Sequence, residues 1–240
     1  MFLSRLVALA WFLAAAAALH GQTAPEEYAT FMSHGKAVAC PVYGNPDAIA
    51  TMIFLHGPSP ADLALGRLEA NFFAEHGFRV LLPDYLSVTT SAKTTAANYR
   101  RWAQVAEDIV ADLRSHPIPR KKIALAGQAL GASVALVAAS HKIGVDAVAE
   151  WSGGLPNEFF SQVQSLPPLL ILHGDQDKQV PIVNARQLVR LCELKDFTCE
   201  AGIYPGESQV FSTQAMDSAN QRTLTFFRTY LWASLPKRAE

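Results

Sequence analysis

The residues that say most about chemistry are 127–131, which read Gly-Gln-Ala-Leu-Gly. Their spacing matches Gly-x-Ser-x-Gly, a sharp strand-to-helix turn that raises one nucleophilic side chain above a sheet. The flanking glycines are needed because only glycine tolerates the close backbone contacts of that turn. The central residue here is Ala129, and its methyl group cannot attack a carbonyl. The sequence therefore predicts an intact turn without its nucleophile.

Two further segments carry side chains suited to catalysis. Residues 173–181 read His-Gly-Asp-Gln-Asp-Lys-Gln-Val-Pro, and residues 204–211 read Tyr-Pro-Gly-Glu-Ser-Gln-Val-Phe. Asp177, in the first segment, has the chemistry to orient a histidine and to stabilise its cation. It is also suited to capping the helix expected near Pro181, because aspartate favours turns and caps. Without a histidine partner, the structural role is the favoured one.

Strand and helix patterns alternate from residue 36 to the end of the chain and would position these segments. Apolar runs predict strands at 36–43, 49–55, 78–82, 122–126, 145–151, 169–173 and 198–204. Amphipathic or small apolar stretches predict helices at 63–76, 98–113, 132–139, 183–194 and 214–231. We expect one α/β domain with a mostly parallel central sheet, helices on both faces, and 36–43 as an edge strand. The carboxyl ends of its strands would share one rim, where ligands bind in such folds.

The order strand, His-Gly, helix, strand, Pro-Asp, helix, strand, turn, helix resembles the α/β-hydrolase fold. The His-Gly-x-x-Asp-x-x-Val-Pro segment and the later Tyr-Pro-Gly make the chain similar to the dienelactone hydrolase family over residues 35–232. The resemblance implies a single-domain α/β-hydrolase fold and an ancestral carboxylic-ester or lactone hydrolase. It does not by itself imply activity, because folds host many functions.

The family uses a Ser or Cys nucleophile, an Asp or Glu, and then a His, in that chain order. The resemblance assigns these positions to Ala129, Asp177 and Gln209. An amide cannot serve as a general base at neutral pH. No histidine follows His173, so a shifted alignment does not supply one. Gln209 could still hydrogen-bond Asp177 and preserve the geometry without the chemistry.

The resemblance also places an oxyanion hole beside the turn. One donor would be the backbone N–H of Leu130, and the second would come from the residue after His56-Gly57. That residue is Pro58, which has no N–H. A shift of one residue would let Gly57 or Ser59 donate instead. The loss matters because one such donor is worth about 3 kcal/mol in a transition state.

Other residues at strand ends are candidates for lining the pocket above the turn. These are His56, Gly57, Asp84, Gln128, Trp151 and Glu207. Asp84 or Glu207 would activate a water well only if its pKa were raised. His56 and His173 are expected to be structural histidines beside glycine turns.

The composition fits one globular domain of an ordinary kind. The 240 residues are 50% hydrophobic and 17% charged, with a formal net charge of −1. This hydrophobic content supports a substantial core and argues against disorder. No basic block is present, so nucleic acid is not an expected partner. The histidines lack metal-ligand spacing, so we expect neither a metal nor another cofactor.

Residues 1–21 resemble a secretory signal peptide rather than part of the domain. Arg5 precedes an apolar run of residues 6–19, and small residues follow near Gly21. The run is short for a membrane span. We therefore expect cleavage near Gly21 and a secreted or periplasmic protein without stable membrane association; an uncleaved anchor is the alternative. Residues 22–34 would form an N-terminal extension and residues 35–240 the domain.

Three cysteines are present, and export would permit a disulfide between two of them. Cys192 lies late in a predicted helix and Cys199 early in the next predicted strand, so the pair could come within bridging distance. Cys40 is interpreted as a small buried hydrophobe.

Altered residues at 58, 129 and 209 favour an exported, catalytically inactive member of the fold that retains a small-molecule or partner binding role. An active hydrolase with a non-standard base or an activated water is one alternative. An engineered knockout of the nucleophile is another, but it would explain Ala129 alone and not Gln209 and Pro58.

Overall fold

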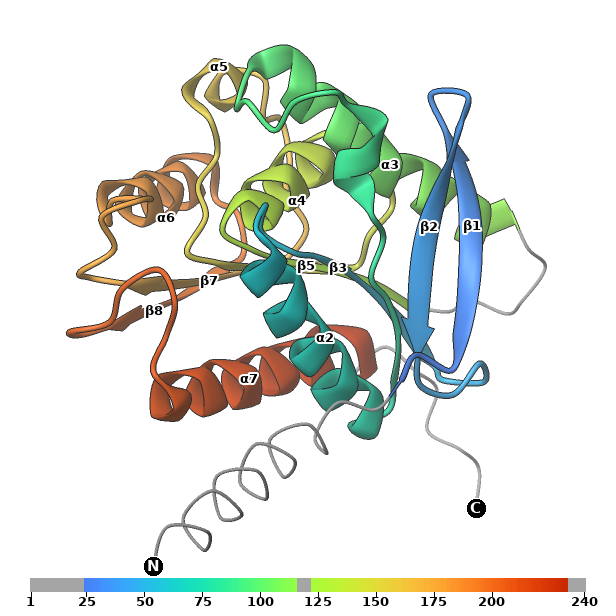
Figure 1. The fold of residues 1–240 in the computed structure, drawn as a ribbon. Helices are drawn as coiled ribbons and strands as arrows, with labels where there is room; N and C mark the ends of the chain where they lie inside the picture. The colour runs from blue at the N-terminus through green and yellow to red at the C-terminus, as the bar shows by residue number, and fades with distance from the viewer. Residues whose placement is uncertain (1–23, 116–121, 233–240) are drawn as a thin grey trace, which may run out of the picture.

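The computed structural model describes residues 24–115 and 122–232, which form an eight-stranded sheet between two layers of helices (Figure 1). The strands are β1 (Glu27–Ser33), β2 (Lys36–Tyr43), β3 (Ala50–Leu55), β4 (Phe78–Leu81), β5 (Lys122–Gln128), β6 (Ala147–Trp151), β7 (Leu169–Gly174) and β8 (Cys199–Tyr204). Their order is β1-β2-β4-β3-β5-β6-β7-β8. The first two neighbouring pairs are antiparallel and the others parallel. The predicted mostly parallel α/β fold is confirmed.

Helices cover both faces of this sheet. They are α2 (Pro60–Glu75), α3 (Ala96–Ser115), α4 (Leu130–Ser140), α5 (Asn157–Phe160), α6 (Val183–Lys195) and α7 (Thr213–Phe227), with a 3-10 turn at Tyr85–Val88 and a π-helical turn at Arg228–Trp232. Helices α3, α4, α5 and α6 pack on one face, and α2 and α7 on the other (Figure 1). Because both faces are covered, every residue of β3, β6 and β7 is buried. Helix α4 is buried throughout, as its small apolar residues predict.

The sheet extends one strand further than the sequence analysis predicted. β1 pairs with β2 along its whole length, so residues 36–43 are not an edge strand and residues 27–33 belong to the domain. The connecting turn has positive φ angles of 50° at His34 and 70° at Gly35. Two such residues are typical of a tight β-hairpin. The run Tyr-Ala-Thr-Phe-Met, with its aromatic and β-branched residues, was the signal that could have revealed this strand.

Helix α2 begins earlier than predicted because Ser59 caps it. The Ser59 hydroxyl accepts the N–H of Asp62 at 3.1 Å, and the Asp62 carboxylate accepts the N–H of Ser59 at 2.9 Å. This reciprocal pair is a capping box. Pro60 takes the first helical position, where its missing N–H is harmless. The cap fixes the chain directly after β3, which is one wall of the candidate site.

Cys192 on α6 and Cys199 on β8 form a disulfide, as hypothesised from the sequence. Their Cα atoms are 6.2 Å apart and the cysteines are seven positions apart in the chain. In the chain-entropy view, closing so short a loop stabilises the fold by about 2–3 kcal/mol. Cys40 is a free, buried thiol, and burial raises its pKa to about 12, in keeping with a core role.

The predicted signal peptide, residues 1–21, lies outside the described residues. Within the described ranges, no helix has the length and apolar character needed to cross a membrane. The same ranges contain no cluster of three or more His, Cys, Asp or Glu residues arranged to hold a metal ion.

Candidate active site

The turn between β5 and α4 has the geometry of a nucleophile elbow. Ala129 has φ 52° and ψ −118°, a backbone conformation that L-residues rarely adopt. Its N–H donates to the carbonyl of Trp151 at 2.9 Å, which ties the turn to β6. A Cβ atom at Gly127 would lie 2.5 Å from the carbonyl of Gly131, and one at Gly131 would collide with the carbonyl of Leu55. Both glycines are therefore required by the backbone packing.

Asp177 lies in the loop after β7, and one of its carboxylate oxygens holds that loop together. Oδ1 accepts the N–H groups of Gln179 and Val180, both at 2.8 Å. Oδ2 is buried and has no hydrogen-bond partner among the described residues. Helix α6 begins without a side-chain cap, so Asp177 stabilises a turn rather than the helix. Its free oxygen has the chemistry to accept a histidine N–H.

His173, at the end of β7, braces the same loop. Its ring is fully buried, and Nε2–H donates to the carbonyl of Val180 at 2.7 Å. The same nitrogen is 3.6 Å from Oδ2 of Asp177. These contacts give His173 the structural role that the sequence analysis expected.

The loop that carries Gln209 packs against the Asp177 loop through main-chain atoms. The N–H of Gln176 donates to the carbonyl of Glu207 at 2.8 Å. Gly174 lies beneath this contact, because a Cβ atom there would be 2.5 Å from the carbonyl of Ser208. The Gln209 side chain is half-buried, and in the described part of the chain it makes no hydrogen bond to Asp177. The structure thus joins the two loops but not the two side chains.

Of the two positions expected to donate to an oxyanion, one offers a backbone N–H and the other is a proline. Leu130 is the first residue of α4, and the first N–H groups of a helix have no partner within it. Pro58 is exposed and has no N–H to offer. The N–H of Ser59, the shifted alternative, is already donated to Asp62. Gly57 packs on the same carboxylate, since a Cβ atom there would be 2.6 Å from Cγ of Asp62.

His56 is a buried imidazole beside the elbow. Its Nδ1–H donates to the carbonyl of Gly57 at 2.6 Å, and burial lowers its pKa, which favours the neutral ring. The hydroxyl of Tyr85 donates to the carbonyl of His56 at 2.6 Å and fixes the end of β3. Asp84 is exposed and directly precedes the 3-10 turn.

The other three pocket candidates have different roles. The indole of Trp151 lies in the core on the α2/α7 face and donates to the hydroxyl of Thr223 at 3.1 Å, so only its backbone serves the elbow. Glu207 accepts the side-chain and backbone hydrogen bonds of Ser212, both at 2.6 Å, and these bonds lower its pKa. The side chain of Gln128 is buried, and its Oε1 has no partner among the described residues.

Comparison with known proteins identifies the family. The model of the dienelactone hydrolase family matches residues 67–231, more than half of the chain. The chain belongs to the dienelactone hydrolase family. No curated protein matches it significantly.

Solved structures of similar proteins agree with this family fold. Thermogutta terrifontis esterase 2 phosphorylated by paraoxon has a TM-score of 0.72 and 16% identity, covering 85% of this chain and 93% of that one. A dienelactone hydrolase from Anabaena variabilis has a TM-score of 0.70 and 21% identity, covering 85% and 97%. A lidless α/β serine hydrolase from Xanthomonas campestris has a TM-score of 0.68 and 22% identity, covering 88% and 98%. At these identities the likeness establishes the shared fold.

One buried carboxyl group near the elbow of this dienelactone hydrolase family member was not among the residues predicted from the sequence. Glu150 on β6 is fully buried; Oε2 accepts the N–H of Gly153 at 2.9 Å, and Oε1 has no partner among the described residues. Burial raises its pKa to about 8, which keeps the group protonated at neutral pH. A Cβ atom at Gly153 would lie 3.1 Å from the N atom of Ser133, so this loop packs on the first turn of α4. An acidic residue among the apolar residues of Ala147–Trp151 was the available signal.

Replacing Ala129 by glycine should stabilise the protein. The positive φ costs about 1–3 kcal/mol for a residue with a Cβ atom. Glycine removes this strain, but it loses about 0.5–1 kcal/mol more conformational entropy on folding than alanine does. We expect Ala129→Gly to raise the free energy of unfolding in urea by about 0.5–2 kcal/mol. Ala132→Gly, inside α4, is the control and should lower it. Equal destabilisation by both changes would contradict the strain at Ala129.

Glu150 should make stability depend on pH. The pKa of the Glu150 carboxyl is 4.5 in the unfolded chain and about 8 in the folded protein, where it is buried. The contribution of the protonated carboxyl to the free energy of unfolding is therefore complete below pH 4.5 and is lost as the pH rises to about 8. Glu150→Gln keeps an acceptor for Gly153 and cannot ionise. In urea unfolding, the variant should therefore gain at least about 1.4 kcal/mol relative to wild type between pH 5 and pH 8, the equivalent of one pKa unit. Parallel pH profiles for the two proteins would refute this assignment.

Proposed function

We propose that this chain is an exported member of the dienelactone hydrolase family that no longer hydrolyses esters by Ser or Cys chemistry. It instead binds a small apolar or ester-like ligand, or a partner, at the former active site. Ala129 at a fully formed elbow carries the proposal, because the strained turn is retained while the attacking atom is absent. Oδ2 of Asp177, which accepts no hydrogen bond in the described part of the chain, adds support, since the residue at the base position, Gln209, does not engage it.

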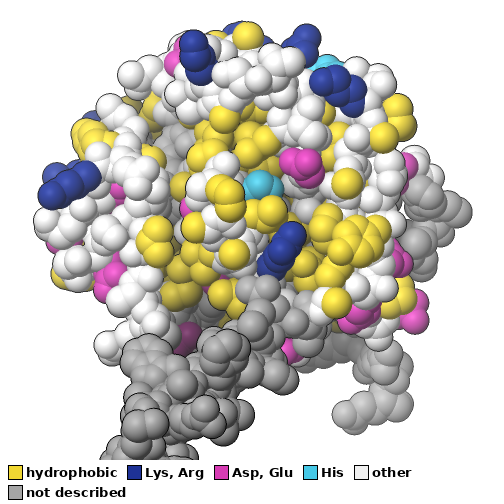
Figure 2. Space-filling view, in the orientation of Figure 1, with side chains coloured by type: hydrophobic (Ala, Val, Ile, Leu, Met, Phe, Trp, Pro, Cys, Tyr) yellow, Lys and Arg dark blue, Asp and Glu magenta, His cyan; other side chains and the backbone are white. Residues whose placement is uncertain are grey.

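The character of the site supports an uncharged ligand. Figure 2 shows hydrophobic side chains gathered near the middle of the face around one histidine, with one acidic and one basic side chain among them and most other charged side chains toward the rim. At the elbow, a methyl group stands where the family carries a polar nucleophile, and burial disfavours the charged form of His56. Ligand sites are commonly apolar with a few polar groups that fix orientation. An ester or another weakly polar molecule fits this chemistry better than an ion does.

A hydrolase with a non-standard base is the second candidate, and His56 is the observation that favours it. A neutral imidazole with Nδ1 protonated has Nε2 available to take a proton from water. Glu207 is unsuited to that task because its hydrogen bonds with Ser212 lower its pKa. Without a nucleophile, acceleration would be limited to about 10³–10⁴-fold over water.

Rebuilding the catalytic groups tests which parts of the site were lost. Wild type should neither hydrolyse p-nitrophenyl acetate saturably nor gain a phosphoryl adduct from paraoxon in an intact-mass measurement. Ala129→Ser with Gln209→His should restore only weak esterase activity, because Pro58 still offers no N–H. Adding Pro58→Ala should raise kcat/KM by about 10²–10³-fold over the double variant, the worth of one oxyanion donor.

Saturable hydrolysis by wild type that His56→Asn abolishes would contradict the proposal and favour the second candidate. His173→Asn is the matched control, because that histidine is structural. A triple variant no better than the double would refute the role assigned to Pro58.

Export has its own test. Expressed with its full N-terminus in a bacterial host that has a periplasm, the protein should be recovered from that compartment with its mature chain starting near Gln22. Its intact mass should also be lower by two hydrogens, because Cys192 and Cys199 oxidise outside the cytosol. A full-length chain found in the cytosol with reduced thiols would contradict export.

A further inference from the structure

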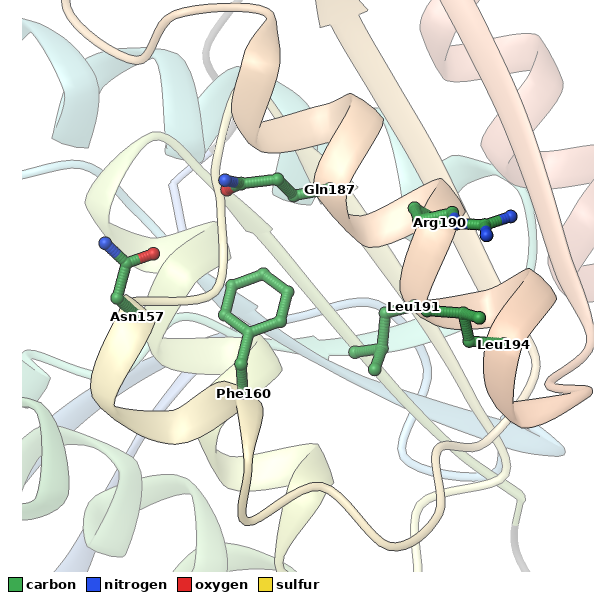
Figure 3. A pocket seen from close by; sticks show the side chains of 6 residues that line it. All are labelled: Asn157, Phe160, Gln187, Arg190, Leu191 and Leu194. Carbon is green, nitrogen blue, oxygen red and sulfur yellow. The ribbon is translucent and has the colours of Figure 1, made fainter.

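A groove of about 290 Å³ lies between α5 and α6, away from the elbow residues. Figure 3 shows the residues that line it: Asn157, Phe160, Gln187, Arg190, Leu191 and Leu194. Its volume is near the lower end of the range for sites that hold small molecules, about 300–1,000 Å³. None of these residues belongs to the elbow, the Asp177 loop or the loop carrying Gln209.

The floor of the groove is apolar and offers an aromatic surface. Phe160 projects from α5 toward α6, with Leu191 beside it (Figure 3). Leu194 remains 66% exposed, although it is a large hydrophobic residue next to this floor. A flat ring placed between Phe160 and the two leucines would bury this exposed carbon surface and stack on an aromatic face.

The two ends of the groove differ in chemistry. Asn157 and Gln187 lie at one end, and in the described part of the chain neither side-chain amide makes a hydrogen bond. Arg190 lies toward the other end and is the one charged residue among the six that line the groove. Its guanidinium pairs with Glu193 at 3.0 Å, and both side chains are more than half exposed. Such surface pairs contribute little, so a ligand carboxylate can replace Glu193.

From this arrangement we propose that the groove binds an elongated aromatic carboxylic acid with a hydroxyl group at its far end. The carboxylate pairs with Arg190, whose guanidinium suits two-point recognition of a carboxylate. The ring stacks on Phe160 between the leucines. The hydroxyl reaches the free amides of Asn157 and Gln187, which can both donate and accept hydrogen bonds. This site is separate from the former active site and does not depend on the function proposed for it.

The disulfide helps to hold the α6 side of this groove in place. Cys192 directly follows Leu191 and links the last turns of α6 to β8. The segment that carries Leu191 and Leu194 is therefore held by a covalent bond as well as by packing.

The test is a titration of the oxidised, isotope-labelled protein with 4-hydroxycinnamate at low salt, followed by amide chemical shifts. We expect a Kd of about 1 mM or tighter for a ligand of this size, with shifts centred on residues 157–160 and 187–194. Arg190→Gln should weaken binding about tenfold, the effect of losing one charge-assisted contact. Arg186→Gln, an exposed arginine on the same helix that does not line the groove, should leave the Kd within twofold.

Two matched ligands separate the contributions at the two ends. Cinnamate lacks the hydroxyl and 4-hydroxycinnamyl alcohol lacks the charge, and each should bind several-fold more weakly. Asn157→Ala should weaken binding of 4-hydroxycinnamate but not of cinnamate. Equal effects of Arg190→Gln and Arg186→Gln, shifts centred on Ala129, or no saturable shifts at 10-fold the expected Kd would each overturn the proposal.

Discussion

The candidate site depends on one close backbone contact, between the start of α4 and the end of β3. Gly131 lies so near the carbonyls of Leu55 and His56 that any side chain there would overlap them. The contact presses the first turn of α4 onto the sheet, and the chain leaving β5 reaches that turn through the positive φ of Ala129. The strain therefore belongs to the connection between strand and helix. It persists with alanine because the packing of α4, rather than a catalytic side chain, imposes it.

The same reliance on the backbone explains how the loops at the rim stay in place without the catalytic side chains. The segments after β7 and β8 are joined by main-chain hydrogen bonds and by the close approach that Gly174 permits. Asp177 uses one oxygen for the N–H groups of its own loop, so it has a reason to remain that is unconnected with hydrolysis. A residue such as Gln209 can then change without displacing the segment that carries it.

Features that follow from periodicity or glycine geometry could be predicted from the sequence; features that depend on which face a residue occupies could not. The strand predicted at 49–55 is observed at Ala50–Leu55, and the elbow glycines have the close contacts expected of them. Trp151 was a pocket candidate, but its indole lies in the core on the face of the sheet that α2 and α7 cover. Glu150, its neighbour, was not recognised, because a strand pattern does not show which alternate residues meet the first turn of α4. For Asp177 the sequence left a catalytic and a structural role open, and hydrogen-bond geometry was needed to show that its structural role is to hold a turn rather than to cap a helix.

The disulfide has a consequence for the order in which the chain becomes organised. Its two cysteines are only seven positions apart, and a short flexible loop has a small entropy of closure. β8, by contrast, is the last strand of the sheet and, among the described strands, pairs only with β7, which must itself be assembled first. In an oxidising compartment the bond can therefore form while most of the chain is still unfolded. The edge strand then arrives at the sheet already tethered to its own helix, as a preassembled unit.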